Sequence, residues 1–272
     1  SPAGTGTVDV TVTQGSESDT LAGAFEYTAA SAAWTPADIT TAMWFNFSDS
    51  ASITLDGSGN IEQADDKSGN TRHLKQTDAA RRFGVLTQNG IDVADLDGTD
   101  RMQTDSFAAL SQPNTYFFAL RHPPNDGVQR FMTDGINSDD RNAWLKDTTN
   151  DQFNYFGGST NNYSSNALVD AWAIVIIIFD STSELWINGS LVDSGGNGSD
   201  GITGLTVGSR GSRAENFHNR PIGEVGMLDR KASTDERQKL EGYLAHEWDK
   251  FLGTTELVDA LPADHPYKSS PP

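Results

Sequence analysis

The feature that most constrains the fold is an unbroken apolar run, WAIVIIIF, at residues 172–179, which has a shorter companion, TYFFAL, at 115–120. Even the longer run is too short to cross a bilayer as a helix. Strands without polar alternation are typical of the centre of a sheet that is covered on both faces. The two runs therefore predict central strands of a buried sheet, and no membrane insertion.

Turn and alternation signals predict further strands. Residues 184–192 (ELWINGSLV) place Asn188-Gly189 between two alternating stretches, the strongest short-range signal for a two-residue hairpin, because both turn positions need a positive φ. Residues 222–229 alternate in the same way. With 26 glycines and many Asn, Asp, Ser and Thr residues, the chain is expected to be all-β with numerous tight turns.

A single long helix is expected near the C-terminus, over residues 233–249. Ser233 and Glu236 have the spacing of a capping box, and the apolar residues that follow fall on one side of a helix. One helix packed on a sandwich is the implied architecture. The last residues, 263–272, are rich in proline and are expected to form an extended tail.

The chain is strongly acidic, with 38 acidic against 19 basic side chains and a formal net charge of −19. Such a charge repels phosphate backbones and anionic membranes, so nucleic acid is not an expected partner. The acidity is explained either by solubility or by carboxylates that bind divalent cations. The absence of cysteine excludes disulfides and thiolate metal sites.

Several stretches in the same order resemble the laminin-G-like, concanavalin A-like domains of bacterial surface proteins and phage tail proteins. They are DSASITLDGSGNIEQADDKSGNTRHLKQ at 49–76, NGIDVADLDGTDRM at 89–102, ELWINGSLV at 184–192, IGEVGMLDRKASTDERQKLEGYLAHEWD at 222–249 and LPADHPYK at 261–268. The resemblance implies an antiparallel jelly-roll β-sandwich over residues 32–262, with one C-terminal-side α-helix. It also implies glycan or protein binding, often with a structural calcium. One departure is Asn46, where the family often has Asp, and it puts a ligand role for that position in doubt.

The first residues form a separate pattern. Residues 7–13 and 21–28 alternate around a turn and predict a β-hairpin. The sequence SPAGTGTVDVTVT, followed by AFEYTA, resembles the last two strands of an IPT/TIG immunoglobulin-like repeat. Residues 1–31 are therefore interpreted either as the end of such a domain or as a hairpin that adds to the main sandwich.

Catalytic patterns are weak. The nearest acidic pairs, Glu224 with Asp229 and Asp180 with Glu184, do not have the even spacing that aligns two carboxylates on one strand face. No Ser nucleophile elbow, phosphate-binding glycine loop or His-rich zinc spacing is present in the sequence. The chain is therefore not expected to be an enzyme, with a polysaccharide lyase or glycosidase as the alternative.

Two acidic loops are candidates for calcium. They concentrate hard oxygen ligands next to glycine, which suits Ca²⁺, and the alternative is that these side chains make Asx turns. The candidate ligands are Asp65, Asp66, Asn70, Asp95, Asp97 and Asp100.

A glycan surface needs exposed aromatic faces, amides and arginines. Residues 141–166 and 209–220 supply these groups, although their aromatics could equally fill the core. Trp144 and Phe153 are assigned to the core. The candidate ligand-binding residues are Tyr155, Tyr163, Asn161, Arg213, Asn216 and His218.

The sequence therefore predicts a non-catalytic module that recognises a polysaccharide or cell-surface glycan. As part of a larger extracellular bacterial or phage fibre protein, it would lie at a cell surface or on a virion. The alternative is a structural virion or surface decoration domain, in which contacts with other subunits or copies of the chain replace ligand binding.

Overall fold

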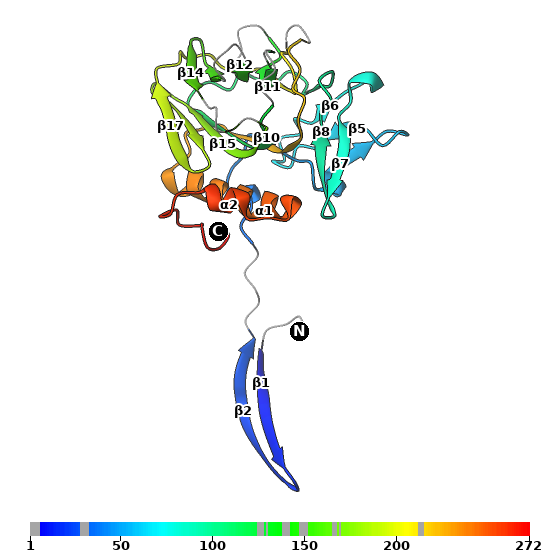
Figure 1. Ribbon diagram of the computed structural model, residues 1–272, viewed down its shortest axis with the longest axis vertical. Coiled ribbons are helices and arrows are strands. Elements are labelled where there is room, and N and C mark those ends of the chain that lie inside the picture. Colours follow the sequence, from blue (N-terminus) through cyan, green and yellow to red (C-terminus); the bar gives the residue numbers. More distant parts are fainter. Residues whose placement is uncertain are drawn as a thin grey trace. The chain divides into compact units, whose positions relative to one another are not determined.

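The computed structural model describes residues 6–27, 33–123, 128, 130–137, 142–146, 152–164, 168, 170–211 and 215–272. The chain divides into two units, Ser1–Ala33 and Trp34–Pro272 (Figure 1).

The first unit is a β-hairpin of β1 (Gly6–Gln14) and β2 (Glu17–Tyr27). The two strands pair antiparallel, and among the described residues they pair only with each other. The register places Val10 opposite Leu21, and Val8, Val12 and Leu21 are exposed apolar side chains. An isolated two-stranded hairpin is marginally stable at best, so this unit has little core of its own.

The second unit is an all-β, antiparallel jelly-roll sandwich, as the sequence predicts. Sheet I consists of β17 (Ser190–Gly195), β16 (Ser183–Ile187), β15 (Trp172–Phe179), β10 (Asn114–Arg121), β19 (Ile222–Leu228), β8 (Ile91–Asp95) and β7 (Gly84–Gln88), with β3 (Met43–Asn46) also paired to β19. Sheet II consists of β14 (Thr160–Ser164), β13 (Gln152–Phe156), β12 (Asn142–Lys146), β11 (Arg130–Gly135), β18 (Leu205–Val207), β9 (Met102–Gln103), β6 (Leu74–Lys75), β5 (Ile61–Ala64) and β4 (Ile53–Leu55).

The two apolar runs are the adjacent strands β10 and β15 at the centre of sheet I. Their side chains alternate between two cores. Val175 and Ile177 face sheet II, whereas Ile174 and Ile176 face the opposite side. Two-sided burial explains why neither run alternates with polar residues, and the prediction of central strands is confirmed.

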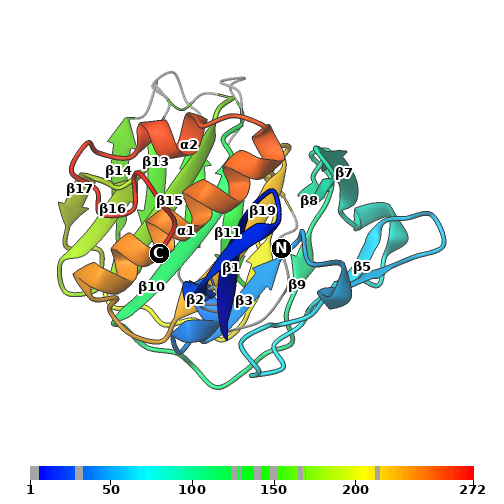
Figure 2. The same cartoon turned by 90° about the horizontal axis from the view of Figure 1, so that it is seen from below.

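The second core lies under helix α1 (Thr234–Leu252), which crosses β10 and β15 in Figure 2. Ser233 is the N-cap, and its side chain and that of Glu236 form the predicted capping box. Leu240, Leu244 and Trp248 bury the helix face against the sheet. A short second helix, α2 (Glu256–Ala260), follows and was not predicted. None of the described helices is long and apolar enough to span a membrane.

The predicted hairpin at Asn188-Gly189 is also confirmed. It joins β16 to β17, and both turn residues have positive φ values, 48° and 76°. A Cβ at position 189 would overlap Pro262, so this turn also requires glycine for space.

The C-terminal residues contact helix α1 through a buried polar group. The His265 imidazole lies 3.1 Å from Glu241 of α1, and both side chains are buried. Arg237 completes this buried group with two bonds to Glu241, at 2.6 and 2.7 Å, and its guanidinium stacks 3.5 Å over the Trp186 ring. Lys268 donates to the carbonyls that end α2. Charge pairing rather than proline stiffness therefore fixes the C-terminal residues.

One carboxyl group, that of Glu224, is fully buried between sheet I and α1. Its two oxygens accept from the indole nitrogens of Trp44, at 2.5 Å, and Trp248, at 3.2 Å. Burial raises the pKa of Glu224 to about 8, and the two indole donors offset only part of this rise. The group therefore holds its proton at neutral pH in the folded protein.

This burial predicts a specific pH dependence of stability. The unfolded Glu224 ionises near 4.5, the folded one near 8, so its contribution is present below 4.5 and is lost as the pH rises to 8. The variant Glu224→Gln cannot ionise, so its free energy of unfolding should fall less than that of the parent as the pH rises, by about 2–4 kcal/mol. The free energy of unfolding in urea, measured at pH 5 and at pH 8, gives this loss. An equal change in unfolding free energy between the two pH values for the variant and the parent would contradict the assignment.

The division into two units predicts that the sandwich folds without the hairpin. Deletion of residues 1–33 should change the melting temperature of the sandwich by less than about 2 °C, which corresponds to under about 1 kcal/mol for a chain of this size. Calorimetry of the two chains tests this. A larger fall would mean that the hairpin contributes to the core of the sandwich.

Candidate functional site

Two of the predicted ligand-binding residues are buried, so their expected exposure is wrong. Tyr155 is inaccessible, because β13 turns Phe153 and Tyr155 into the core, and the Tyr155 hydroxyl donates to Asp193 at 2.9 Å. His218 is likewise inaccessible. Its burial, together with the nearby positive charges of His122 and Arg130, lowers the pKa of His218 to about 3. The assignment of Phe153 to the core is confirmed.

Of the other four candidates, only Asn216 has a described side chain. Asn161 and Tyr163 lie on β14, opposite Tyr155 and Phe153 in the register, but their side chains, like that of Trp144, lie outside the described residues. Arg213 also lies outside them. Asn216 is partly exposed, and its φ of 58° places it in the left-handed region of a tight loop.

The first acidic loop uses its oxygens to hold the backbone. The buried Asp66 carboxylate accepts from the backbone N–H groups of Trp44 at 3.1 Å, Ser68 at 2.9 Å and Arg72 at 3.0 Å. Asp65 pairs with His73 at 3.1 Å. The Asn70 amide donates to the Thr41 and Ala42 carbonyls, both at 3.1 Å.

The second acidic loop is similar. Asp97 accepts from the Thr99 N–H at 2.8 Å, and Asp100 accepts from the Asp97 N–H at 3.1 Å. Burial, together with the charges of Asp97 and Asp95, raises the pKa of Asp100 to about 6. Among the described residues, which include all six candidates, no three acidic or histidine side chains are grouped so that they could hold a metal ion. The hydrogen bonds of both loops are those of Asx turns.

Calcium stays a prediction from the sequence, and a melting experiment decides it. Because the carboxylates are engaged by backbone donors, we expect equal melting temperatures in EDTA and in millimolar Ca²⁺. Binding at a micromolar Kd would instead raise the melting temperature by several degrees, through a stabilisation of about 4 kcal/mol. Such a rise that is lost in Asp97→Asn would support the calcium site.

The acidic pairs considered for catalysis are not arranged for it. Glu224 is enclosed between the sheet and α1 and cannot reach a substrate. Asp180 and Glu184 both approach the ammonium of Lys231, at 3.5 and 3.0 Å. Both carboxylates are thus engaged in ion pairs with the same ammonium group, whereas a glycosidase needs two carboxyl groups that face the scissile bond.

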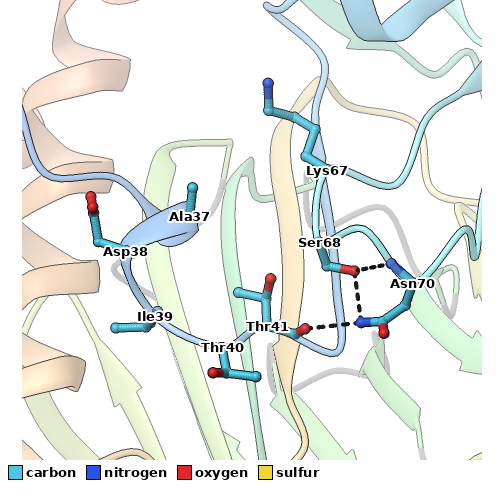
Figure 3. A pocket seen from close by; sticks show the side chains of 8 residues that line it. All are labelled: Ala37, Asp38, Ile39, Thr40, Thr41, Lys67, Ser68 and Asn70. Carbon is cyan, nitrogen blue, oxygen red and sulfur yellow. Dashed lines mark hydrogen bonds between the residues drawn. The ribbon is translucent and has the colours of Figure 1, made fainter.

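A pocket of about 370 Å³ lies where the chain enters the sandwich, and Figure 3 shows its lining. One wall is the 3₁₀ turn η1 (Pro36–Asp38) and the segment that leads to β3, and the other is the loop between β5 and β6. The side chains come from Ala37, Asp38, Ile39, Thr40, Thr41, Lys67, Ser68 and Asn70.

The polar groups of this pocket are held in place by their neighbours. Asp38 closes a capping box with Thr35, accepting from its N–H at 2.8 Å. The Asn70 amide bridges the two walls, because it donates to the Thr41 carbonyl and to the Ser68 hydroxyl (Figure 3). Lys67 pairs with Asp49, and its ammonium lies 5.0 Å from the Trp44 ring. The pocket therefore presents hydroxyl, amide, carboxylate and ammonium groups in fixed positions.

Sequence reasoning missed this pocket, apart from Asn70. Its residues come from two loops that are separated by about one tenth of the chain, and Ser, Thr and Asn in loops carry no periodic signal. The capping box Thr35–Asp38 was the one readable feature, because the spacing matches that of a turn start.

No family model matches the chain, and no curated protein matches it in sequence. Solved structures match its fold. The binding domain of Paraclostridial mosquitocidal protein 1 has a TM-score of 0.55 at 15% identity, over 77% of this chain and 53% of that one. Domain 4 of AbnA, the extracellular GH43 arabinanase of Geobacillus stearothermophilus, crystallised with arabinotriose, scores 0.53 at 11% identity, over 74% and 98%.

The ligand-binding domain of botulinum neurotoxin serotype D, crystallised with N-acetylneuraminic acid, scores 0.51 at 12% identity, over 74% of this chain and 50% of that one. The chain thus spans about half the length of the two toxin domains. At these identities the likeness concerns the fold alone, which is a β-sandwich.

Proposed function

We propose that the sandwich is a non-catalytic glycan-binding module and that the pocket between residues 37–41 and 67–70 is its binding site. The observation that carries the proposal is the lining of this pocket, which is polar on both walls and of a size that small-molecule sites commonly have. A ligand that fits it must offer many hydroxyl groups and little apolar surface. A sugar ring has this chemistry.

The positions of the polar groups support this assignment. The Thr40 hydroxyl can donate and accept. The Ser68 hydroxyl already donates to the Ala42 carbonyl and accepts from Asn70, and the Asn70 amide nitrogen is engaged and leaves its oxygen as an acceptor. Because these groups are fixed before binding, little conformational entropy is lost when a sugar binds. The fold supports the same reading, since the related domains were crystallised with arabinotriose and with N-acetylneuraminic acid.

The absence of an aligned carboxylate pair favours binding over catalysis. Among the described residues, the fully buried Glu224 is enclosed by indole rings and the pair Asp180–Glu184 is neutralised by Lys231. We therefore place the chain among the binding modules rather than among the lyases or glycosidases of the same fold.

We further propose that the module belongs to a larger extracellular protein, at a bacterial surface or on a phage fibre. The hairpin supports this arrangement, because its apolar side chains Val8, Val12 and Leu21 are exposed in the first unit. A neighbouring immunoglobulin-like domain of the IPT/TIG kind would supply the sheet that covers them. The alternative is a structural decoration domain, for which contacts between subunits replace the glycan.

Filling the pocket should abolish glycan binding. Thr40 is exposed at its rim, so Thr40→Trp places an indole ring in the pocket without disturbing the core. We expect at least a tenfold loss of signal on an array of bacterial and algal glycans, which corresponds to about 1.4 kcal/mol.

The matched control is Thr254→Trp, which changes an exposed threonine beyond α1 in the same way. It should bind as the parent does. Equal binding by Thr40→Trp and the parent would mean that the glycan binds outside this pocket. If the parent binds no glycan on the array, the structural alternative is favoured. Release of reducing or unsaturated ends would contradict the non-catalytic assignment.

A further inference from the structure

Two arginines that the pocket does not use lie next to each other: Arg81 ends the 3₁₀ turn Ala79–Arg81, and Arg101 directly precedes β9 of sheet II. The Arg101 backbone N–H donates to the Arg81 carbonyl at 3.0 Å, and the Arg81 guanidinium donates to the Thr99 carbonyl at 3.2 Å. The two positive charges are close enough that Arg81, after burial, contributes to lowering the pKa of Arg101. Like charges held together in this way favour the binding of an anion.

Arg101 has no acidic partner among the residues that the structure describes. Its Nη1 donates to the Gly211 carbonyl at 3.4 Å, while its Nε is buried without a hydrogen-bond partner. The acidic side chain nearest to Arg81 is Asp78, at 3.8 Å, and both of these side chains are well exposed.

Other buried arginines of this chain are treated differently. Arg82 is paired with Asp56 and Glu62, at 2.9 and 2.6 Å, and Arg237 is paired with Glu241.

Arg72 is also partly buried and has no ion pair among the described residues, but its Nη1 donates to the Ala42 carbonyl at 2.7 Å and its guanidinium lies 4.6 Å from the centre of the Phe107 ring. Arg101 differs from it in the buried Nε that has no hydrogen-bond partner. Burying a charge without a partner costs free energy, which a bound oxyanion would offset.

The surroundings of the two arginines suit a sugar chain. The Arg81 guanidinium lies 5.1 Å from the centre of the Phe217 ring, which is partly exposed. Gln103 reaches the same Gly211 carbonyl as Arg101 and donates to the Thr206 hydroxyl at 2.8 Å. Gln103 thus lies on the same face as the arginine, beside an aromatic ring.

A row of polar side chains continues from this point across sheet II. The register places Gln103 opposite Lys75, and Lys75 opposite Gln63. Directly opposite residues share a face of the sheet. Thr206, opposite Gln103, points away from the core that Leu205 and Val207 face, but it is itself buried, so the exposed part of this face begins at Gln103. Amide and ammonium groups therefore line a path over β9, β6 and β5, where Lys75 pairs with Asp105 at 3.2 Å and the Gln63 amide donates to Asp65 at 2.7 Å.

We propose that Arg81 and Arg101 bind a carboxylate or sulfate group of an acidic polysaccharide, whose neighbouring sugar units lie along Gln103, Lys75 and Gln63. This site is separate from the pocket at residues 37–41 and 67–70. Most of the chain's net charge of −19 is screened beyond about 8 Å at physiological salt, so the nearby charges decide binding. Two of these are carboxylates, Asp78 beside Arg81 and Asp105 beside Lys75, with which a bound polyanion would compete.

The test uses three polymers with one backbone: dextran, carboxymethyl dextran and dextran sulfate. Each is immobilised, and the binding of the full chain is measured by interferometry at about 0.15 M salt. We expect binding to at least one charged dextran and none to neutral dextran. The tighter of the two charged polymers identifies the oxyanion as a carboxylate or a sulfate.

Arg81→Gln and Arg101→Gln should each weaken this binding about tenfold, the loss of a charge-assisted hydrogen bond. Arg81 is exposed over 38% of its side chain, so its variant keeps the fold even if the Arg101 variant does not. The control is Lys250→Gln, which removes the same charge from an exposed position on α1 and should stay within twofold of the parent.

Three results would overturn the proposal: binding to neither charged dextran, equal binding to neutral dextran, or an equal loss in Lys250→Gln. The pocket is tested independently, because Thr40→Trp should keep its affinity for the charged dextrans. If that variant loses this affinity, the oxyanion binds in the pocket and not at Arg81 and Arg101. Failure with dextrans while the array signal persists would leave the glycan-binding function intact.

Discussion

Burial of sheet I on both faces is the constraint on which the rest of the sandwich depends. The strands β10 and β15 have apolar side chains on each face, so one face requires sheet II and the other requires a cover. Helix α1 is that cover, and Trp248 and Phe251 pack it against Trp172. Gly226 belongs to the same arrangement, because a Cβ there would overlap the Phe117 ring. The middle of the outer face of sheet I is therefore covered by α1, whereas its edge strands β7 and β17 keep exposed side chains such as Leu86 and Leu191.

The polar groups inside this helix-covered layer are held by specific partners. Glu224 keeps its proton because two indoles donate to it and no cation reaches it closely, whereas Glu241 is buried as an ion pair with Arg237. Burial of a carboxyl group costs free energy, and this cost is reduced by protonation at Glu224 and by an ion pair at Glu241. Glu224 connects sheet I to α1, and Glu241 connects the C-terminal tail to α1, so both have a structural role. Because both are buried, neither can contact a substrate.

The fold could be predicted from the sequence because short sequence patterns determine its main elements. The unbroken run at 172–179, the Asn188-Gly189 turn and the Ser233–Glu236 capping box each report a physical requirement within a few residues. The site could not be read in this way. Tyr155 alternates with Asn154 on a strand, and sequence alone does not say which of the two faces the core. His218 stands in a polar loop but is buried, because neighbouring strands enclose it.

Charge distribution, rather than net charge, connects these observations to function. A net charge of −19 argues against polyanions as long as the charges are treated as uniform. The structure shows instead that most partly buried cations are matched to carboxylates, as Arg82 is to Asp56, and that Arg101 is not. Screening makes the local exception matter more than the distant surplus. In an acidic protein, the positions that lack a counter-ion are therefore the informative ones.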